Sequence, residues 1–213
     1  MTATRFILTR HGETQWNLEQ RMQGHQDSQL TGLGRQQAEA LARRLEHEAF
    51  DHLYSSDLGR CQKTAQTIAA VTGHAINLDP RLRERNLGIV QGLSFSMVSD
   101  RYPDVSKAMQ SYDPDYVVPE GESYRMVLQR TLASLDDLAR KHPGEQILIV
   151  SHGGVLNILF KHLLGIPLQT TRSFRVHNAG LNVVMRYEAT WMVETLGDVS
   201  HLKVLYSYDE ILR

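Results

Sequence analysis

The feature that most limits how this chain can fold is an alternation between short apolar runs and longer amphipathic segments. The apolar runs cover residues 6–9, 52–55 and 146–150, with a weaker run at 75–78. Each of the first three is followed by polar or glycine residues and then by a stretch of helical periodicity. Strands that alternate with helices indicate an α/β fold with three layers, in which a mostly parallel central sheet carries helices on both faces.

The helices are expected where apolar residues recur every three or four positions. One begins near Leu33 with Thr31 as its N-cap, and a second follows Asp57, which is predicted to cap it. Two more are expected over residues 123–140 and 153–163. Two late runs, 181–187 and 191–196, predict a hairpin that turns at residues 188–189 and adds an antiparallel edge to the sheet.

A chain of 213 residues with 41% hydrophobic content suits a single domain over residues 1–213. Within it, residues 112–122 are predicted to form a long loop or lid, because they contain prolines and no periodic pattern. The wider segment 87–122 and the tail after His201 give no readable fold.

Charge, hydropathy and cysteine content disfavour a nucleic-acid-binding, membrane-spanning or secreted protein. The net charge of -1 gives no global basic character that would favour nucleic acid, and no stretch of about 18 uncharged apolar residues predicts a membrane span. The N-terminus lacks the long apolar region of a signal peptide. Cys61 is the single cysteine, so no internal disulfide is possible, which fits a cytoplasmic location.

Polar motifs stand at the ends of three predicted strands. Residues 10–13 (Arg-His-Gly-Glu) follow the first strand, residues 55–60 contain Arg60, and residues 151–154 (Ser-His-Gly-Gly) follow the strongest strand. Ligands of open α/β sheets bind outside the carboxyl ends of the strands. We therefore expect two histidines and two arginines to meet over one pocket, with glycine backbone and a helix N-terminus close to the ligand.

This set of side chains suits a phosphoryl group. Arginine matches phosphate oxygens bidentately, and a neutral imidazole is a competent nucleophile near pH 7. Glu84 is the preferred general acid, with Glu13, Glu120 and Glu122 as other candidates. Metal ligation is the competing interpretation of His11 and His152, but a ligand motif such as two histidines at i, i+4 with a glutamate does not occur around them.

The same blocks give the chain a clear resemblance to a known family. Residues 8–17, 21–24, 27–34, 56–65, 82–84, 121–123 and 151–155 stand in the order found in the phosphoglycerate mutase-like branch of the histidine phosphatase superfamily. The resemblance spans about residues 5–165. A lone Arg-His-Gly would be weak evidence, whereas the ordered set is specific.

The resemblance implies a role for each matched position. His11 is the expected nucleophile and Glu84 the proton donor. The residues expected to hold the phosphoryl group or line the pocket are Arg10, Arg60, His152, Asn17, Gln23, Gly24 and Gly153. No metal and no cofactor are implied, and the expected partner is a small phosphorylated metabolite; a homodimer is a further possibility.

Three functions stay open. The leading one is a phosphatase that hydrolyses a small phosphomonoester through a phosphohistidine, and the second is a phosphoglycerate mutase. The third, an inactive binding domain, is disfavoured because His11, Glu84 and His152 are all present. Met109 and Gln110 stand where mutases of this type carry an arginine pair, which favours the phosphatase. The identity of the phosphomonoester depends on residues 87–122.

Overall fold

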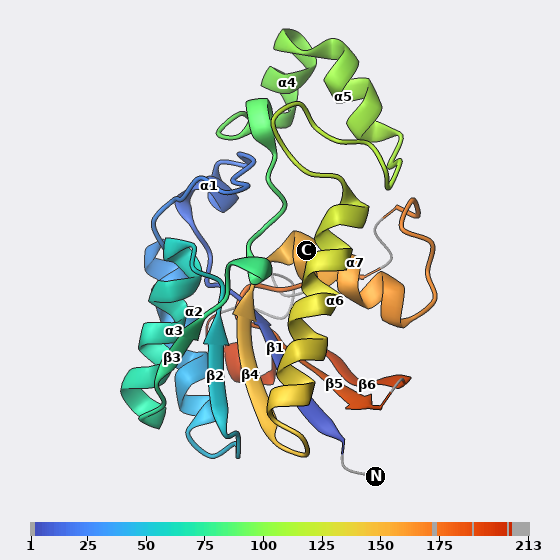
Figure 1. The fold of residues 1–213 in the computed structure, drawn as a ribbon. Helices are drawn as coiled ribbons and strands as arrows, with labels where there is room; N and C mark the ends of the chain where they lie inside the picture. The colour runs from blue at the N-terminus through green and yellow to red at the C-terminus, as the bar shows by residue number, and fades with distance from the viewer. Residues whose placement is uncertain (1–2, 172–173, 189, 204, 206–213) are drawn as a thin grey trace.

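The computed structural model describes residues 3–171, 174–188, 190–203 and 205, and these contain a six-stranded mixed sheet (Figure 1). Its strand order is β3-β2-β4-β1-β5-β6. The strands are β1 (Thr4–Arg10), β2 (His52–Ser55), β3 (Ile76–Leu78), β4 (Gln146–Ser151), β5 (Leu181–Tyr187) and β6 (Thr190–Asp198). The first four pair in parallel, whereas β5 and β6 are antiparallel to their neighbours. The predicted sheet with an antiparallel edge is confirmed.

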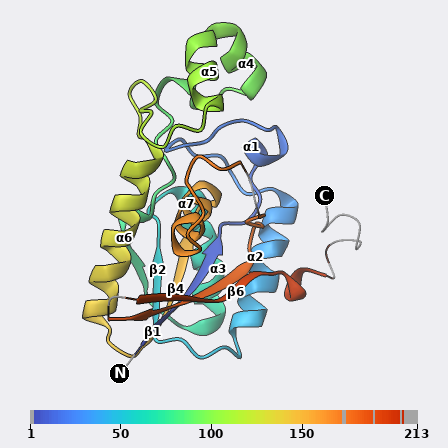
Figure 2. The same cartoon turned by 90° about the vertical axis from the view of Figure 1, so that its right-hand side faces the viewer.

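Helices cover both faces of this sheet (Figures 1 and 2). Helices α2 (Gly32–Leu45) and α3 (Gly59–Thr72) pack on one face, where Ile7 and Leu148 belong to their apolar cluster. Helices α6 (Tyr124–Lys141) and α7 (Gly153–Leu163) pack on the other, against Phe6, Leu8 and Ile149. Successive side chains of β1 and β4 thus alternate between two cores, which explains why residues 6–8 and 147–150 in the middle of these strands are all apolar.

The two predicted helix caps have different outcomes. Thr31 caps α2 as predicted, since its side chain accepts a hydrogen bond from the Gly34 amide at 2.9 Å. The prediction for Asp57 is wrong, because Leu58 is the N-cap of α3. The Asp57 carboxylate instead accepts hydrogen bonds from Arg83, with Nε at 2.6 Å, and this ion pair joins the start of α3 to the segment before Glu84.

Residues 87–122, for which the sequence predicted no fold, form a small cap. It contains a 3-10 turn (Gly88–Val90), α4 (Phe95–Arg101) and α5 (Pro103–Gln110), which stand beyond the carboxyl ends of the parallel strands (Figures 1 and 2). Val90, Val98 and Val118 form the buried centre of its own apolar cluster. Residues 112–122 contain turns and no helix or strand, as predicted for a loop.

The remaining elements are short. They are α1 (Gln15–Leu18) and two 3-10 turns at Pro80–Leu82 and Ser200–Leu202. The predicted hairpin joins β5 to β6, although its turn residue Ala189 lies outside the described residues, as do 206–213 of the tail. Within the described part of the chain, no helix has the length and apolar character needed to cross a membrane.

Candidate active site

The three polar motifs meet because β4 pairs in parallel with both β1 and β2. Arg10 lies opposite Ser151 in the register, and the His11 amide donates to the Ser151 carbonyl at 3.1 Å. The Ser56 amide donates to the carbonyl of Val150 at 2.9 Å, which brings the second motif alongside. The imidazoles of His11 and His152 consequently lie with ring centroids 5.3 Å apart.

His11 is held in one tautomer. Its Nδ1 lies 2.8 Å from the Gly12 carbonyl, which can only accept a hydrogen bond, so Nδ1 carries the proton and Nε2 keeps its lone pair. The side chain is buried, and this burial, followed by the charges of Arg60 and Arg10, holds its pKa well below the ordinary value. A neutral imidazole with a free lone pair on Nε2 is therefore the form present at neutral pH.

His152 lies one layer deeper than His11. It is fully buried and does not belong to the wall of either cavity described below. Its Nε2 is 2.8 Å from Ser56 Oγ, and burial, together with Arg60 and His11, lowers its pKa well below the ordinary value. Cys61 packs against it and donates to the Ser151 carbonyl; burial raises the pKa of this thiol, which fits the predicted core role.

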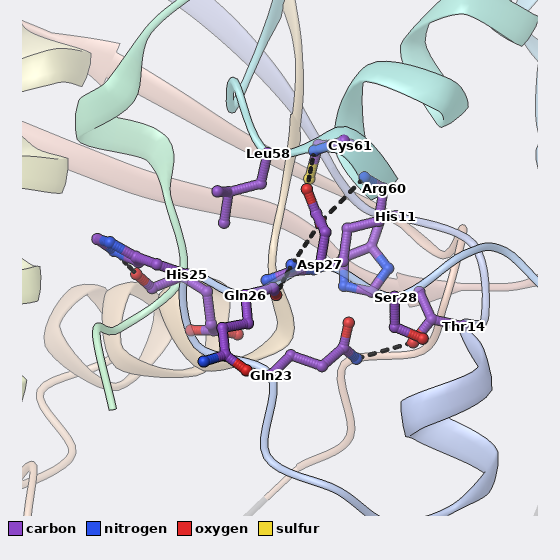
Figure 3. Close-up of polar contacts among 12 residues, drawn as sticks. His11, Thr14, Gln23, His25, Gln26, Asp27, Ser28, Leu58, Arg60 and Cys61 are labelled. Atoms are coloured by element: carbon purple, nitrogen blue, oxygen red, sulfur yellow. Dashed lines mark hydrogen bonds and ion pairs between the residues drawn. The ribbon is translucent and has the colours of Figure 1, made fainter. Parts of the chain in front are cut away.

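Arg60 is a fully buried cation fixed by several acceptors (Figure 3). Its Nη1 donates to Asp27 Oδ1 at 2.8 Å and to the Gln26 carbonyl at 2.9 Å, and its Nη2 donates to the Gly24 carbonyl at 2.8 Å. Its Nε is also buried and has no hydrogen-bond partner among the described residues. The guanidinium is thus held rigidly beside His11 with a donor available for an anion.

Arg10 occupies the last position of β1, where it reaches over the start of α7. Its Nη1 donates to the Val176 carbonyl at 3.0 Å. A Cβ at Gly153 would lie 3.1 Å from Arg10 Cζ, so a larger residue there would push the guanidinium aside. Gly153 therefore makes room for a cation next to the N-terminus of α7.

Two adjoining cavities open at this site. One, of about 350 Å³, has His11 in its wall together with six of the other predicted residues, Arg10, Asn17, Gln23, Gly24, Arg60 and Glu84. The other, of about 730 Å³, contains Gly153. Arg10, Glu84 and Tyr124 belong to both walls, so the two spaces adjoin at the predicted acid.

Asn17 and Gln23 are organised around Thr14. Asn17 Oδ1 accepts from the Thr14 amide at 3.1 Å and completes the capping box of α1. Gln23 Nε2 donates to Thr14 Oγ1 at 2.8 Å (Figure 3), and its buried Oε1 has no hydrogen-bond partner in the described part of the chain. Gln23 thus offers a polar atom that a ligand can satisfy.

Glu84 has a fixed carboxylate. One oxygen accepts from the Arg85 amide at 2.9 Å and the other from the Gly154 amide at 3.0 Å. A Cβ at Gly154 would meet Glu84 Oε1 at 2.4 Å, so only glycine permits this approach. Of the four glutamates considered from the sequence, Glu84 is the one that shares a cavity wall with His11.

The backbone around Glu84 is held by Arg130 of α6. Its two terminal nitrogens donate to the carbonyls of Arg81, Arg83 and Glu84 at 2.7, 2.6 and 2.9 Å, and its guanidinium pairs with Glu122. Arg130 was not predicted as a site residue, because an arginine in an amphipathic helix resembles a solvated residue. No local signal distinguishes the two roles, since the carbonyls it binds lie 46 to 49 residues away in the chain.

Arg21 and Arg85 also line the smaller cavity and were missed. Both are committed to backbone carbonyls, since Arg21 Nε donates to Gly92 at 2.6 Å and Arg85 Nε to Glu122 at 2.7 Å. Their position in the sequence could have indicated them. Arg21 lies within residues 21–24, and Arg85 directly follows residues 82–84, both of which carry the family resemblance.

Comparison with known proteins identifies the family. The model of the "Histidine phosphatase superfamily (branch 1)" matches residues 6–199. The chain belongs to this superfamily. It is 40% identical over 200 residues to a protein of Cronobacter sakazakii named "Probable phosphoglycerate mutase GpmB", covering 92% of this chain and 93% of that protein.

Solved structures agree with this assignment. Bacillus stearothermophilus YhfR superposes with a TM-score of 0.88 at 36% identity, covering 93% of this chain and 99% of that one. A mycobacterial glucosyl-3-phosphoglycerate phosphatase in complex with VO3 superposes with a TM-score of 0.79 at 30% identity, covering 91% of this chain and 98% of its own. The names of these relatives cover both mutase and phosphatase activities.

The state of His11 can be measured by NMR of the ¹⁵N-labelled imidazoles. We expect the Nδ1–H tautomer, still neutral at about pH 6, because the lowered pKa lies below the ordinary value of about 6.5. The unfolded chain would protonate this group near pH 6.5, so its contribution to stability is complete above that pH and falls as the pH drops. His11→Gln assigns the signal. Half-protonation at or above pH 6.5 would contradict the assigned state.

Proposed function

We propose that this protein hydrolyses small phosphomonoesters through a phosphohistidine on His11. The observation that carries the proposal is the tautomer of His11, whose Nδ1 is hydrogen-bonded to the Gly12 carbonyl while a lone pair remains on Nε2. Arg60 and Arg10 lie close enough to this buried, neutral base to lower its pKa further, and they supply the positive charge that a phosphate dianion requires.

The substrate phosphoryl group would sit against His11 in the smaller cavity. Arg60 Nε and Arg10 would donate to its equatorial oxygens, and the positive end of the α7 dipole would add to their field. The bound dianion would favour protonation of His152, whose charge would then add to the positive field behind His11. Gln23 Oε1 could accept a hydrogen bond from a protonated phosphate oxygen or a substrate hydroxyl.

The reaction would have two steps. In the first, His11 Nε2 forms a bond to phosphorus, the bond to the leaving oxygen breaks, and protonated Glu84 gives its proton to that oxygen. In the second, Glu84 takes a proton from water, the water oxygen attacks phosphorus, and the N–P bond breaks. Inorganic phosphate leaves and His11 returns to its neutral form.

The runner-up, a phosphoglycerate mutase, is favoured by the name of the 40% identical relative. The wall of the smaller cavity favours hydrolysis, because neither residue at the expected arginine positions supplies a cation. Met109 of α5 presents an apolar side chain there, and Gln110 Nε2 donates to Ser106 Oγ at 3.1 Å. The additional cations Arg21 and Arg85 already donate to backbone carbonyls. A mutase must keep its phosphoglycerate intermediate bound until the phosphoryl group returns to it. This wall would bind the second acidic group of that intermediate weakly.

A phosphoenzyme on His11 tests the mechanism. Brief incubation with a ³²P-labelled phosphomonoester, followed by denaturation, should leave label that is acid-labile and stable in alkali, as expected of a phosphoramidate. His11→Ala should abolish the label, whereas His47→Ala, at an exposed position, should keep it. Label that persists in His11→Ala, or that resides on serine, would falsify the mechanism.

The role of Glu84 is tested by Glu84→Gln, which preserves shape but removes the transferable proton. Turnover should fall by roughly 10² to 10⁴-fold, the usual range for general acid–base catalysis. The loss should be smaller with p-nitrophenyl phosphate, whose leaving group needs no proton. Glu120→Gln, at an exposed position of the cap, serves as the matched control. An equal loss for good and poor leaving groups would assign Glu84 to binding instead.

The fate of the phosphohistidine separates the two activities. The assay supplies 3-phosphoglycerate with a trace of 2,3-bisphosphoglycerate and follows 2-phosphoglycerate and free phosphate together. We expect phosphate release to dominate, with phosphoglycerate and with better phosphoester substrates, because the cavity arginines other than Arg10 and Arg60 already donate to backbone carbonyls. Rapid formation of 2-phosphoglycerate that depends on the bisphosphate, with little phosphate released, would make the mutase correct.

A further inference from the structure

Two histidines and a glutamate gather at the end of the sheet opposite the active site. His52 is the first residue of β2, while His142 ends α6 and Glu145 immediately precedes β4. Figure 1 places the start of β2 and the end of α6 at one end of the sheet, and α4 and α5 beyond the other. The parallel pairing of β2 with β4, with His52 opposite Ile147, brings these residues together.

Their donor atoms are close enough to share one ion. His52 Nε2 lies 2.6 Å and His142 Nδ1 lies 3.0 Å from the same carboxylate oxygen, Glu145 Oε2. The three donor atoms all lie within 4.8 Å of one another. Both ring nitrogens face Glu145 Oε2, so an outward movement of this oxygen would leave a position between the three donor atoms for an ion.

The set of donors is selective. Two imidazoles and one carboxylate form a borderline-soft ligand set that suits Zn²⁺ and its neighbours Co²⁺ and Ni²⁺ better than Mg²⁺ or Ca²⁺. Three protein ligands would leave a fourth position for water, which the partly exposed Glu145 side chain allows. The two imidazole ligands distinguish this cluster from a surface patch made only of carboxylates, which would favour Mg²⁺ or Ca²⁺.

The second nitrogen of His142 has the kind of support that metal-bound histidines have. His142 Nε2 lies 2.9 Å from the hydroxyl of the buried Tyr54, and Lys141 Nζ donates to the same hydroxyl at 3.1 Å. When Nδ1 binds a metal, Nε2 carries the proton and donates to Tyr54 Oη. The ring orientation is therefore fixed from behind, away from the proposed ion.

We propose that His52, His142 and Glu145 form a binding site for a zinc-like divalent transition-metal ion. Ligand bonds of about 2.0–2.2 Å separate neighbouring donors by roughly 3.3 Å in a tetrahedral site. From 2.6 and 3.0 Å, the two N–O separations must therefore widen by about 0.7 and 0.3 Å, and the partly exposed Glu145 side chain has room to move outward. The ion would join the start of β2 to the α6–β4 connection and stabilise the fold without entering the reaction.

The test uses chelator-treated full-length protein, titrated with Co²⁺ and Zn²⁺. Co²⁺ should give a visible absorption band of low coordination number at one equivalent per chain, and Zn²⁺ should displace it and raise the melting temperature. His52→Ala and the isosteric Glu145→Gln should each weaken Zn²⁺ binding by about tenfold or more. Phosphatase turnover should be the same in chelator as with Zn²⁺, because the site is remote from His11.

Two controls locate the ion. His47→Ala removes an exposed histidine elsewhere, and His11→Ala removes the imidazole most able to bind metal in the active site; both should keep the wild-type Zn²⁺ affinity. Circular dichroism of each variant establishes that it is folded before titration. No Zn²⁺ binding at micromolar concentration, or binding that disappears in His11→Ala and survives in Glu145→Gln, would overturn the proposal.

Discussion

The site depends above all on the parallel pairing of β1 with β4. This pairing sets Arg10 opposite Ser151, so the next residue of each strand is a histidine and the two rings arrive together at one edge of the sheet. Both strands are buried on both faces, between α2 and α3 on one side and α6 and α7 on the other. A shift of register by one residue would turn every apolar side chain of a strand toward the wrong core, so the alignment of the histidines is protected by the whole interior.

Electrostatic cost explains much of the arrangement around these rings. Arg60 is fully buried, and an unpaired buried charge would be strongly destabilising. Asp27 and two backbone carbonyls offset this cost without removing the positive field, which adds to the larger effect of burial in lowering the pKa of His11 and His152. A neutral imidazole next to a fixed cation is the combination that a nucleophile for a dianionic substrate needs, because the same guanidinium attracts the phosphate and keeps the attacking nitrogen unprotonated.

The sequence predicted the sheet and its helices well because their signals are local and repeated. Residues 147–150 are all apolar, and the amphipathic stretches that follow the strands carry unambiguous periodicity. The cap was not predictable, since α4 and α5 are short and their apolar residues are buried only against each other and the adjoining loops. Asp57 has the appearance of a helix cap, but a distant partner, Arg83, takes its carboxylate. Long-range polar contacts of this kind leave no local pattern, and the same reason hid Arg130.

The cap has a separate apolar cluster, centred on Val90, Val98 and Val118, rather than sharing the two cores that flank the sheet. A segment that is stabilised largely by itself can change in sequence or length without disturbing the strands beneath it. Met109 lines the smaller cavity from this segment, while His11, the proposed nucleophile, and Arg10 and Arg60, proposed to hold the phosphate, belong to the scaffold. Substitutions in the cap would therefore change which substrate fits, while the residues proposed for phosphoryl transfer stay the same. New substrate specificities can evolve on this scaffold in that way.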